Sequence, residues 1–399
     1  MNILVINAGS SSVKYQLIDM NSKQAIAIGL VERIGIEGSR IKHDYFIDGK
    51  ENRKIVEQSI ENHETALTLV ANLLMDDQIG VIQNPEAIQA VGHRVVHGGE
   101  KFAKTVLINP EVKKVIQELA PLAPLHNPAN LTGIEVAEKV FPNAKQVAVF
   151  DTSYHQSMPE KAYRYAIPNP FYEKNGIRRY GFHGTSHQFV YNQAVDYLQN
   201  SNLKAITLHL GNGASMAAID SNQVKDTSMG LGPLAGLIMG TRSGDLDPSI
   251  IFYMVEELGL TLAEVKNILN KESGMLGITE SSDARDIEEK YYQKEAKAIL
   301  GNEMYAYRIK KYIGSYIAAL NGVDTLIFTG GIGENDALMR SLICKNLDSL
   351  GIQLDENLNK ERNHASKIEE IHVKNTGIQI LIIPTNEELQ IANETASFI

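Results

Sequence analysis

The sequence predicts an α/β protein made of two related lobes. Apolar runs with strand character alternate along the chain with segments of helical periodicity, which is typical of this class. A strand–loop–strand pattern at residues 3–19 also returns about half a chain later, at residues 205–220, and both copies end in Ile-Asp. Two such copies favour a duplicated architecture.

The first half of the chain gives the following elements. Residues 3–6 form an apolar run that stops at a small-residue loop, residues 7–12, and residues 13–18 largely alternate as in a second strand. Together they predict a hairpin. Helical periodicity then marks residues 61–75, 110–119, 131–140 and 186–199, and residues 146–150 predict a strand that ends at Asp151.

The second half predicts strands at residues 205–210 and 216–220 around the loop 211–215, helices at 261–269 and, in pieces, at 287–320, and a strand at 324–329. That strand runs into the loop 330–335 and a helix-like stretch at 336–350. A strand at 379–383 is stopped by Pro384, and the last residues predict a helix. We expect an N-terminal lobe of residues 1–150, with residues 385–399 packing back onto it, and a C-terminal lobe of residues 151–384.

Composition narrows the class of protein. The 399 residues are 43% apolar and 22% charged, which excludes a disordered or low-complexity chain. The net charge of −10 argues against a nucleic-acid-coating protein but leaves small anionic substrates open. The single cysteine, Cys344, excludes an intrachain disulfide and favours a reducing compartment. Because we find neither a signal-peptide pattern nor a membrane-spanning apolar run, we expect a cytoplasmic protein without a membrane partner.

Three loops rich in glycine or serine each follow an apolar strand, at residues 7–12, 211–215 and 330–335. Exposed backbone N–H groups in such turns can hold phosphate oxygens, so three of them together favour a nucleotide site over three plain tight turns. The Walker pattern and the dinucleotide-binding glycine pattern are both missing. Lys14, just past the first loop, is either a ligand of a terminal phosphate or a solvated strand lysine.

Two arginines, Arg94 and Arg242, stand among glycines and polar residues, which places them on loops. A guanidinium there can clamp a carboxylate or a phosphoryl group, or can form a structural ion pair, for Arg242 with Asp245 or Asp247. Among the histidines, His183 is the best donor to a phosphoryl group, whereas a buried structural role stays open for others: His97, His155 and His187.

Carboxylates follow two of the predicted strands. Asp151 comes directly after residues 146–150, and ligands of α/β proteins bind at the carboxyl ends of strands. Glu387 and Glu388 follow residues 379–383 and could hold Mg²⁺, which prefers oxygen ligands. Alternatively, the two glutamates simply favour the positive end of the last helix.

Jointly, these segments resemble the acetate kinase family. The matching stretches are residues 7–12 (NAGSSS), 92–99 (GHRVVHGG), 124–128 (PLHNP), 150–152 (FDT), 179–187 (RYGFHGTSH), 209–213 (HLGNG), 239–245 (MGTRSGD) and 330–335 (GGIGEN). The resemblance implies the two-lobed, duplicated actin-like ATPase fold of the ribonuclease H type, with a cleft between the lobes. It also implies reversible transfer of the γ-phosphoryl group of ATP to acetate, giving acetyl phosphate and ADP.

The resemblance also assigns roles to residues. Arg94 and Arg242 grip acetate and the transferring group, His183 stabilises the transition state, Asp151 is catalytic, and Asn7 and Glu387 are the Mg²⁺ positions, with Mn²⁺ as an alternative ion. The implied pocket for the acetate methyl group is Val96, Leu125, Phe182 and Pro233. The implied ATP positions are Lys14, His209, Leu210, Gly211, Asn212, Gly213, Asp283, Ala284, Arg285, Gly331, Ile332, Gly333, Glu334 and Asn335.

Charge suggests the mechanism. Acetate is already a carboxylate at neutral pH and needs no general base, so we expect direct in-line transfer without a phosphoenzyme. For the same reason we expect Asp151 to orient Arg94 or the waters of Mg²⁺ rather than to remove a proton. Two alternatives stay open: a propionate or butyrate kinase of the same fold, and a non-catalytic actin-like nucleotide-binding protein. The resemblance also implies a homodimer, with residues 250–320 as interface candidates.

Overall fold

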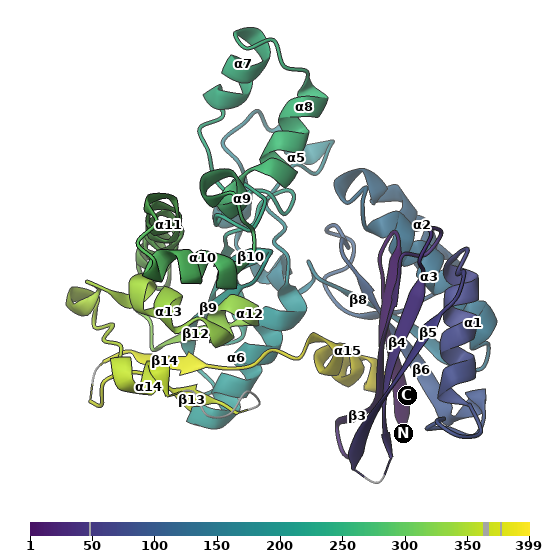
Figure 1. Ribbon diagram of the computed structural model, residues 1–399. Coiled ribbons are helices and arrows are strands. Elements are labelled where there is room, and N and C mark those ends of the chain that lie inside the picture. Colours follow the sequence, from purple (N-terminus) through teal and green to yellow (C-terminus); the bar gives the residue numbers. More distant parts are fainter. Residues whose placement is uncertain (48, 362–366, 376) are drawn as a thin grey trace. The chain divides into compact units, whose positions relative to one another are not determined.

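The computed structural model describes residues 1–47, 49–361, 367–375 and 377–399. The chain forms two compact units, each an α/β structure around one sheet (Figure 1). Unit 1 comprises Met1–Tyr154 and Asn386–Ile399, and unit 2 comprises His155–Thr385. The last segment of the chain therefore belongs to the unit that the first segment begins.

Unit 1 contains an eight-stranded sheet in the order β5-β4-β3-β2-β1-β6-β8-β7. Its strands are β1 Asn2–Ala8, β2 Ser12–Asp19, β3 Gln24–Glu32, β4 Arg40–Ile47, β5 Lys50–Glu57, β6 Ile88–Val95, β7 Val106–Leu107 and β8 Lys145–Phe150. The first five strands are antiparallel neighbours, and β1, β6 and β8 are parallel. The carboxyl ends of these three parallel strands therefore lie at one edge of the sheet.

Both faces of this sheet are covered. The helices of unit 1 are α1 His63–Leu74, α2 Pro110–Glu118, α3 Asn127–Val140 and α15 Glu387–Ala396, with 3₁₀ turns at Pro85–Ala87 and Ala120–Leu122. Alternate residues of β1 serve opposite faces: Leu4 and Ile6 pack in the cluster that contains α1 and α3 residues, whereas Ile3 and Val5 pack with residues of α15. Burial on both faces explains why β1 is one continuous apolar run.

Unit 2 repeats the central part of this arrangement. Its strands are β9 Lys204–Leu210, β10 Ala214–Asp220, β11 Gln223–Thr227, β12 Thr325–Thr329, β13 Glu369–Glu370 and β14 Gln379–Ile382, in the order β11-β10-β9-β12-β14-β13. The meander β11-β10-β9 is antiparallel and continues into two parallel strands, as β3-β2-β1 continues into β6 and β8. The predicted duplicated α/β class is confirmed.

The helices of unit 2 are mostly short, apart from α6 and the long α11. They are α4 Glu160–Tyr163, α5 Pro170–Glu173, α6 Gly184–Leu198, α7 Ser249–Glu256, α8 Leu262–Asn267, α9 Gly274–Thr279, α10 Ala284–Tyr292, α11 Ala296–Leu320, α12 Gly330–Asn335, α13 Ala337–Cys344 and α14 Glu356–Lys360. A 3₁₀ turn at Tyr154–Ser157 begins on the last residue of the first unit 1 segment, another lies at Asp348–Leu350, and a π-helical turn lies at Ile268–Glu272. Helices α6 and α11 both pack against β9.

Two local predictions need correction. Arg94 lies within β6 rather than on a loop, because this strand is buried and its polar residues are satisfied: His93 Nε2 lies 2.8 Å from Gln146 Oε1 of the neighbouring β8. The third glycine-rich loop is helical, since residues 330–335 form the single-turn helix α12. The two hairpins, β1–β2 and β9–β10, are confirmed.

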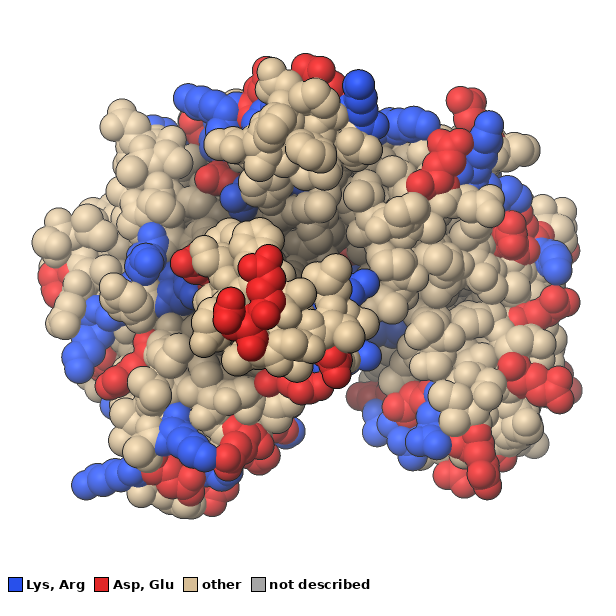
Figure 2. All heavy atoms as spheres, turned by 90° about the horizontal axis from the view of Figure 1, so that it is seen from above, with Lys and Arg blue, Asp and Glu red and all other residues tan. Residues whose placement is uncertain are grey.

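One face of the molecule mixes both signs of charge. On the face shown in Figure 2, Lys and Arg side chains are interspersed with Asp and Glu side chains. Within the described part of the chain, the helices are all too short or too polar to cross a membrane.

Candidate functional site

The carboxyl edge of the unit 1 sheet carries a buried ion pair. Val95 and Phe150 are partners in the parallel strands β6 and β8, so Arg94 and Asp151 meet where the strands end. Arg94 Nε lies 3.0 Å from Asp151 Oδ1, and Nη2 lies 2.7 Å from Oδ2. This two-point contact fixes the plane of the guanidinium.

Burial sets the electrostatics of the pair, because Asp151 is only 1% exposed. Burial raises the pKa of the Asp151 carboxyl, and the positive charge of Arg94 opposes that rise. Burial also disfavours the charge of Arg94, but Asp151, Glu387 and Glu388 outweigh it and hold the pKa of Arg94 above its usual value. The edge is therefore an environment in which an arginine stays charged beside several carboxylates.

Two asparagines of α3 fix the segment that follows β6. The side-chain oxygen of Asn130 accepts from Val96 N at 3.0 Å, and that of Asn127 accepts from His97 N at 3.1 Å. Val96 is buried, whereas Leu125, the other predicted methyl-pocket residue of this unit, is 72% exposed. The remaining two residues of that predicted pocket, Phe182 and Pro233, belong to unit 2.

The predicted metal residues stand near this ion pair. Asn7, at the end of β1, is the register partner of Lys14 in β2. Lys14 forms an ion pair with Glu388, the neighbour of Glu387 in the first turn of α15. Since Glu387 also acts on the pKa of both Arg94 and Asp151, these groups share one edge of unit 1. An amide oxygen and carboxylates are the donors that Mg²⁺ prefers, so the residue types fit this ion.

In unit 2, the loop after β9 brings a histidine and an arginine together. A Cβ built on Gly213 would lie 2.9 Å from Arg242 Nη2 and 3.6 Å from His183 Nε2. Both side chains therefore lie against the backbone of this loop, and a side chain at Gly213 would press on the Arg242 guanidinium. His183 itself adopts a left-handed conformation, φ 56°, immediately before α6, a strained geometry found often at functional sites.

His183 belongs to a cluster of histidines and hydroxyls. Its ring stacks on that of His209 with centroids 4.4 Å apart. Its Nδ1 lies 2.9 Å from Ser215 Oγ, which also lies 2.8 Å from Nε2 of the buried His187. Sequence reasoning did not single out Ser215. It lies at the end of the predicted loop 211–215, but no sequence signal pairs it with a histidine.

Arg242 lies on an irregular segment, as predicted. Its Nη1 donates to the Pro233 carbonyl at 2.5 Å, and burial lowers its pKa. The acids that could have formed a structural ion pair serve the loop instead. Asp245 accepts from Gly236 N at 2.7 Å and from the Tyr312 hydroxyl at 2.5 Å, and Asp247 accepts from Ser249 N at 2.9 Å. These bonds favour the anion-clamp interpretation of Arg242.

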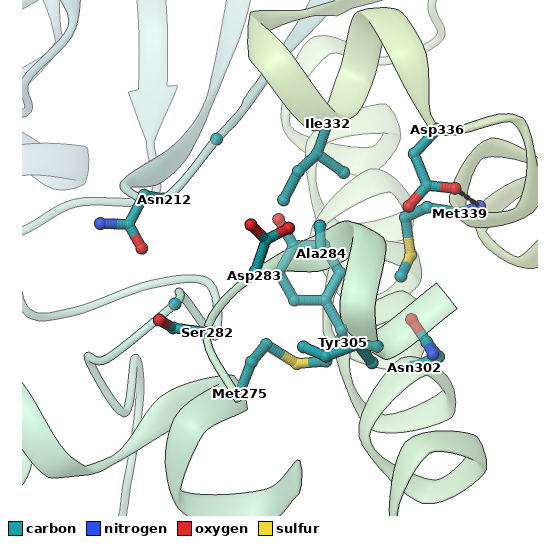
Figure 3. A pocket seen from close by; sticks show the side chains of 13 residues that line it. Asn212, Met275, Ser282, Asp283, Ala284, Asn302, Tyr305, Ile332, Asp336 and Met339 are labelled. Atoms are coloured by element: carbon teal, nitrogen blue, oxygen red, sulfur yellow. Dashed lines mark hydrogen bonds between the residues drawn. The ribbon is translucent and has the colours of Figure 1, made fainter. Parts of the chain in front are cut away.

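A cavity of about 340 Å³ adjoins the same loop in unit 2 (Figure 3). Side chains from α9, α10, α11, α12 and α13 converge on it. Its lining is Gly211, Asn212, Gly240, Met275, Ser282, Asp283, Ala284, Ile287, Asn302, Tyr305, Ile332, Asp336 and Met339. A mostly apolar cavity of this size with a few polar groups suits a small organic ligand such as a nucleobase. Arg285, in contrast, is 90% exposed and paired with Asp283.

The predicted phosphate residues of α12 are held rigidly. Gly330 has φ 76°, and a Cβ there would lie 2.8 Å from the Leu210 carbonyl oxygen. Glu334 Oε1 accepts from Gly330 N at 3.0 Å. The fully buried Arg340 donates to the carbonyls of Gly333 and Glu334 at 2.9 and 3.0 Å. The turn Gly330–Asn335 is therefore fixed from both sides, a feature that the sequence did not reveal.

Comparison with known proteins identifies relatives over the full length. The model of the acetokinase family matches residues 2–393. A relative from Carboxydothermus hydrogenoformans named acetate kinase is 51% identical over 401 residues, covering 100% of this chain and 99% of its own. The crystal structure of Porphyromonas gingivalis acetate kinase superposes with a TM-score of 0.94 at 44% identity, covering 99% of each chain. The crystal structure of a propionate kinase from Francisella tularensis superposes with a TM-score of 0.91 at 41% identity, covering 100% of both chains.

Proposed function

The chain belongs to the acetokinase family, and on that premise we propose that it transfers the γ-phosphoryl group of ATP reversibly to acetate, giving acetyl phosphate and ADP. One observation carries the proposal most directly. The loop of Gly211, Asn212 and Gly213 begins in the cavity wall and ends against Arg242 and His183. A nucleotide whose base occupies the cavity can therefore extend its phosphates along the loop toward both cationic and donor groups.

The proposed roles follow from charge. Acetate attacks as a carboxylate, so no residue has to take a proton from it. The obstacle is the repulsion between two anions, which Arg94 and Arg242 offset, while His183 donates to the transferring phosphoryl group. Asp151 sets the orientation of Arg94 through their two-point ion pair. We infer direct in-line transfer with no phosphoenzyme.

A divalent cation completes the proposed site. Asn7 and Glu387 would hold it, and Mg²⁺ is the ion proposed, with Mn²⁺ as a substitute of the same donor preference. When bound, the ion neutralises charge on the phosphate oxygens. Lys14, in its ion pair with Glu388, supplies a further positive charge on the same edge of unit 1.

Acetate is the proposed acceptor because Val96, Leu125, Phe182 and Pro233 match the small apolar pocket that the family uses for a methyl group. The resemblance to the Francisella propionate kinase favours propionate as a second acceptor. A pocket of this kind separates two acids that differ by one methylene by only ~1–3 kcal/mol.

We further propose a cytoplasmic homodimer. Unit 2 exposes large apolar side chains on and beside α7 and α8: Ile250, Phe252, Tyr253, Leu258 and Leu262. None of the residues of α7 is buried, although the helix is mostly apolar. Because monomeric proteins rarely expose such a contiguous patch, a second copy of the chain is the partner proposed for it. Light scattering after size exclusion tests the mass, and Phe252→Glu should give monomers.

An acceptor panel tests the activity. Purified protein with Mg²⁺ and ATP is given acetate, propionate, butyrate or glycerol, and acyl phosphate is trapped with hydroxylamine. The highest kcat/KM for acetate supports the proposal. Preference for propionate or butyrate would change the substrate but keep the reaction. Bound ATP with no acyl phosphate from any acid would favour the non-catalytic, actin-like alternative.

A further inference from the structure

Four side chains of unit 2 form a continuous line of hydrogen bonds that ends at His183. Thr207 Oγ1 lies 2.7 Å from His187 Nδ1, His187 Nε2 lies 2.8 Å from Ser215 Oγ, and Ser215 Oγ lies 2.9 Å from His183 Nδ1. Thr207, His187 and Ser215 are all fully buried. They come from β9, α6 and β10, so the line exists only in the folded unit.

The number of protons restricts how this line can be arranged. The hydroxyl of Ser215 has a single proton and lies between two ring nitrogens, so it donates to one and accepts from the other. His187 has only one ring proton to give, because burial and the neighbouring His155 and His209 lower its pKa well below the usual value. The whole line must therefore point either toward His183 or away from it.

Thr207 decides the direction. If the line pointed away from His183, the hydroxyl proton of Thr207 would need another acceptor, and the nearest is the Ala217 carbonyl oxygen at 3.5 Å. That separation lies beyond the roughly 2.5–3.0 Å of a normal O–H···O bond. His187 Nδ1, at 2.7 Å, is the better acceptor. A buried hydroxyl left without an acceptor is costly, so the proton of Thr207 belongs on the bond to His187.

We propose that Thr207, His187 and Ser215 form a one-directional relay that holds the ring proton of neutral His183 on Nε2. Thr207 donates to His187 Nδ1, His187 Nε2–H donates to Ser215, and Ser215 donates to His183 Nδ1. The three are positioning residues, since they act through His183. The proposal rests on the proposed function, in which His183 serves the transferring phosphoryl group.

This arrangement has a chemical advantage. The Nε2 edge of His183 lies against Gly213, beside Arg242. With the proton on Nε2, the ring offers a hydrogen-bond donor to a phosphoryl oxygen without having to become charged. With the proton on Nδ1, the same edge would present a lone pair to that anion and repel it. The relay therefore lets His183 donate to a phosphoryl oxygen as a neutral ring.

The direct test is NMR of the full chain carrying ¹⁵N-labelled histidine, recorded above pH 7. The His183 signals are assigned by their loss in His183→Gln. We expect Nε2 of His183 to be protonated and Nδ1 to be unprotonated. Protonated Nδ1 with unprotonated Nε2 in the unchanged protein would overturn the relay. This reading is independent of turnover, so it stands even if the acceptor panel finds no acyl phosphate.

Two matched variants test the consequence for catalysis. Thr207→Val removes the hydroxyl at nearly constant shape, whereas Thr207→Ser keeps it. We expect about a tenfold loss of kcat in the valine variant, less than the ~10²–10³ for loss of a donor itself, with KM values little changed and with Nδ1-protonated His183 appearing in the NMR spectrum. The serine variant should behave like the unchanged protein. Equal kcat and equal spectra for the valine and serine variants would refute the relay.

Ser215→Ala gives a second measurement at the other end of the relay, where we expect the same loss of kcat. Its control is Ser228→Ala, which removes a buried serine hydroxyl that bonds Met216 N at 2.9 Å rather than a histidine. Equal losses in the two alanine variants would show a general packing effect and would contradict the relay.

Discussion

Arg94 and Asp151 bind each other through Nε and Nη2 of the guanidinium, and Nη1 takes no part in this ion pair. The contact joins the ends of two parallel strands, so the backbone of the sheet sets its geometry. A guanidinium fixed in this way can meet an incoming carboxylate without reorganising. That is the form of pre-organisation from which electrostatic catalysis gains most.

Replacing Asp151 by asparagine tests this orienting role. The shape is kept but the charge is lost, so Arg94 is no longer held in one plane, and we expect kcat to fall by ~10²–10³. The double variant Asp151→Asn/Arg94→Lys should be no worse than the poorer single variant, because both changes disrupt the same ion pair. Steady-state kinetics of the three variants measures this. Full kcat in Asp151→Asn would exclude the role.

Arg242→Ala should be one of the most damaging changes in unit 2. Arg242 Nη2 lies against Gly213 next to His183, so the change removes a positive charge from this loop. We expect a loss of ~10²–10³ in kcat and a smaller change in KM for ATP. Arg53→Ala, at an exposed ion pair with Asp44, is the control and should leave kcat unchanged. An Arg242→Ala enzyme within a few-fold of the original would remove this residue from the mechanism.

The preference for acetate over propionate should depend on the size of the side chain at Val96. Shortening this buried side chain to alanine enlarges the proposed methyl pocket, and the ratio of kcat/KM for propionate to that for acetate should rise by ~10-fold or more. The acceptor panel measures it directly. Val136→Ala, at a buried valine of α3 that lies in the apolar core of unit 1, is the matched control and should leave the ratio unchanged. A constant ratio in Val96→Ala would place the acyl group elsewhere.

The Mg²⁺ dependence of the rate should distinguish the roles of Glu387 and Glu388. Removing divalent cations with EDTA should abolish turnover, and Mg²⁺ should restore it. In Glu387→Gln the Mg²⁺ concentration for half-maximal rate should rise, because a carboxylate ligand has been lost. Glu388→Gln instead breaks the ion pair with Lys14 and should affect KM for ATP more than the metal requirement. Identical metal titrations for both variants would contradict the assignment of Glu387.

Asp336 should make stability depend on pH. Burial raises its pKa to about 6, so the folded chain binds a proton there that the unfolded chain has released above about pH 4. Stability should therefore fall as pH rises from about 4 to about 6. Asp336→Asn keeps a cap for Met339 N and should be more stable than the unchanged protein at pH 8, by at most ~3 kcal/mol, with the gap closing toward pH 4.

Thermal unfolding at pH 4.5 and pH 8 measures this difference. Asp355→Asn is the control, because Asp355 caps α14 in the same way, accepting from Asn357 N and Leu358 N, on a more exposed helix. A stability gap for Asp336→Asn that is the same at both pH values would show that the carboxyl is not buried as described.

Local patterns were enough to predict the two central hairpins of the fold. The apolar runs of β1 and β9 and the small residues after them mark the two hairpins. The sequence analysis predicts no element at β3, β4 or β5. In β5 nearly every side chain is exposed, and its mixed charge hides the alternation of a strand. The strand that carries Arg94 was missed because His93 and Gln146 satisfy each other across two strands, which only the sheet reveals.

For the site, the sequence could name residue types but not their partners. The glycines at 211 and 213 and the two arginines follow from loop chemistry and from the family resemblance. The line from Thr207 to His183 could not be predicted. Thr207, His187 and Ser215 lie on three different elements, and no spacing in the sequence indicates that they meet. The support of α12 by Arg340 has the same origin in tertiary structure.

The place of α15 has a consequence for biosynthesis. Its residues Ile391 and Ala392 cover Ile3, Val5 and Val147, yet they are translated only after the segment that forms unit 2. One face of the unit 1 sheet therefore stays uncovered on the ribosome while the segment that forms unit 2 is translated. Because an uncovered apolar face is prone to aggregation, we expect the nascent unit 1 to stay aggregation-prone until α15 packs onto it.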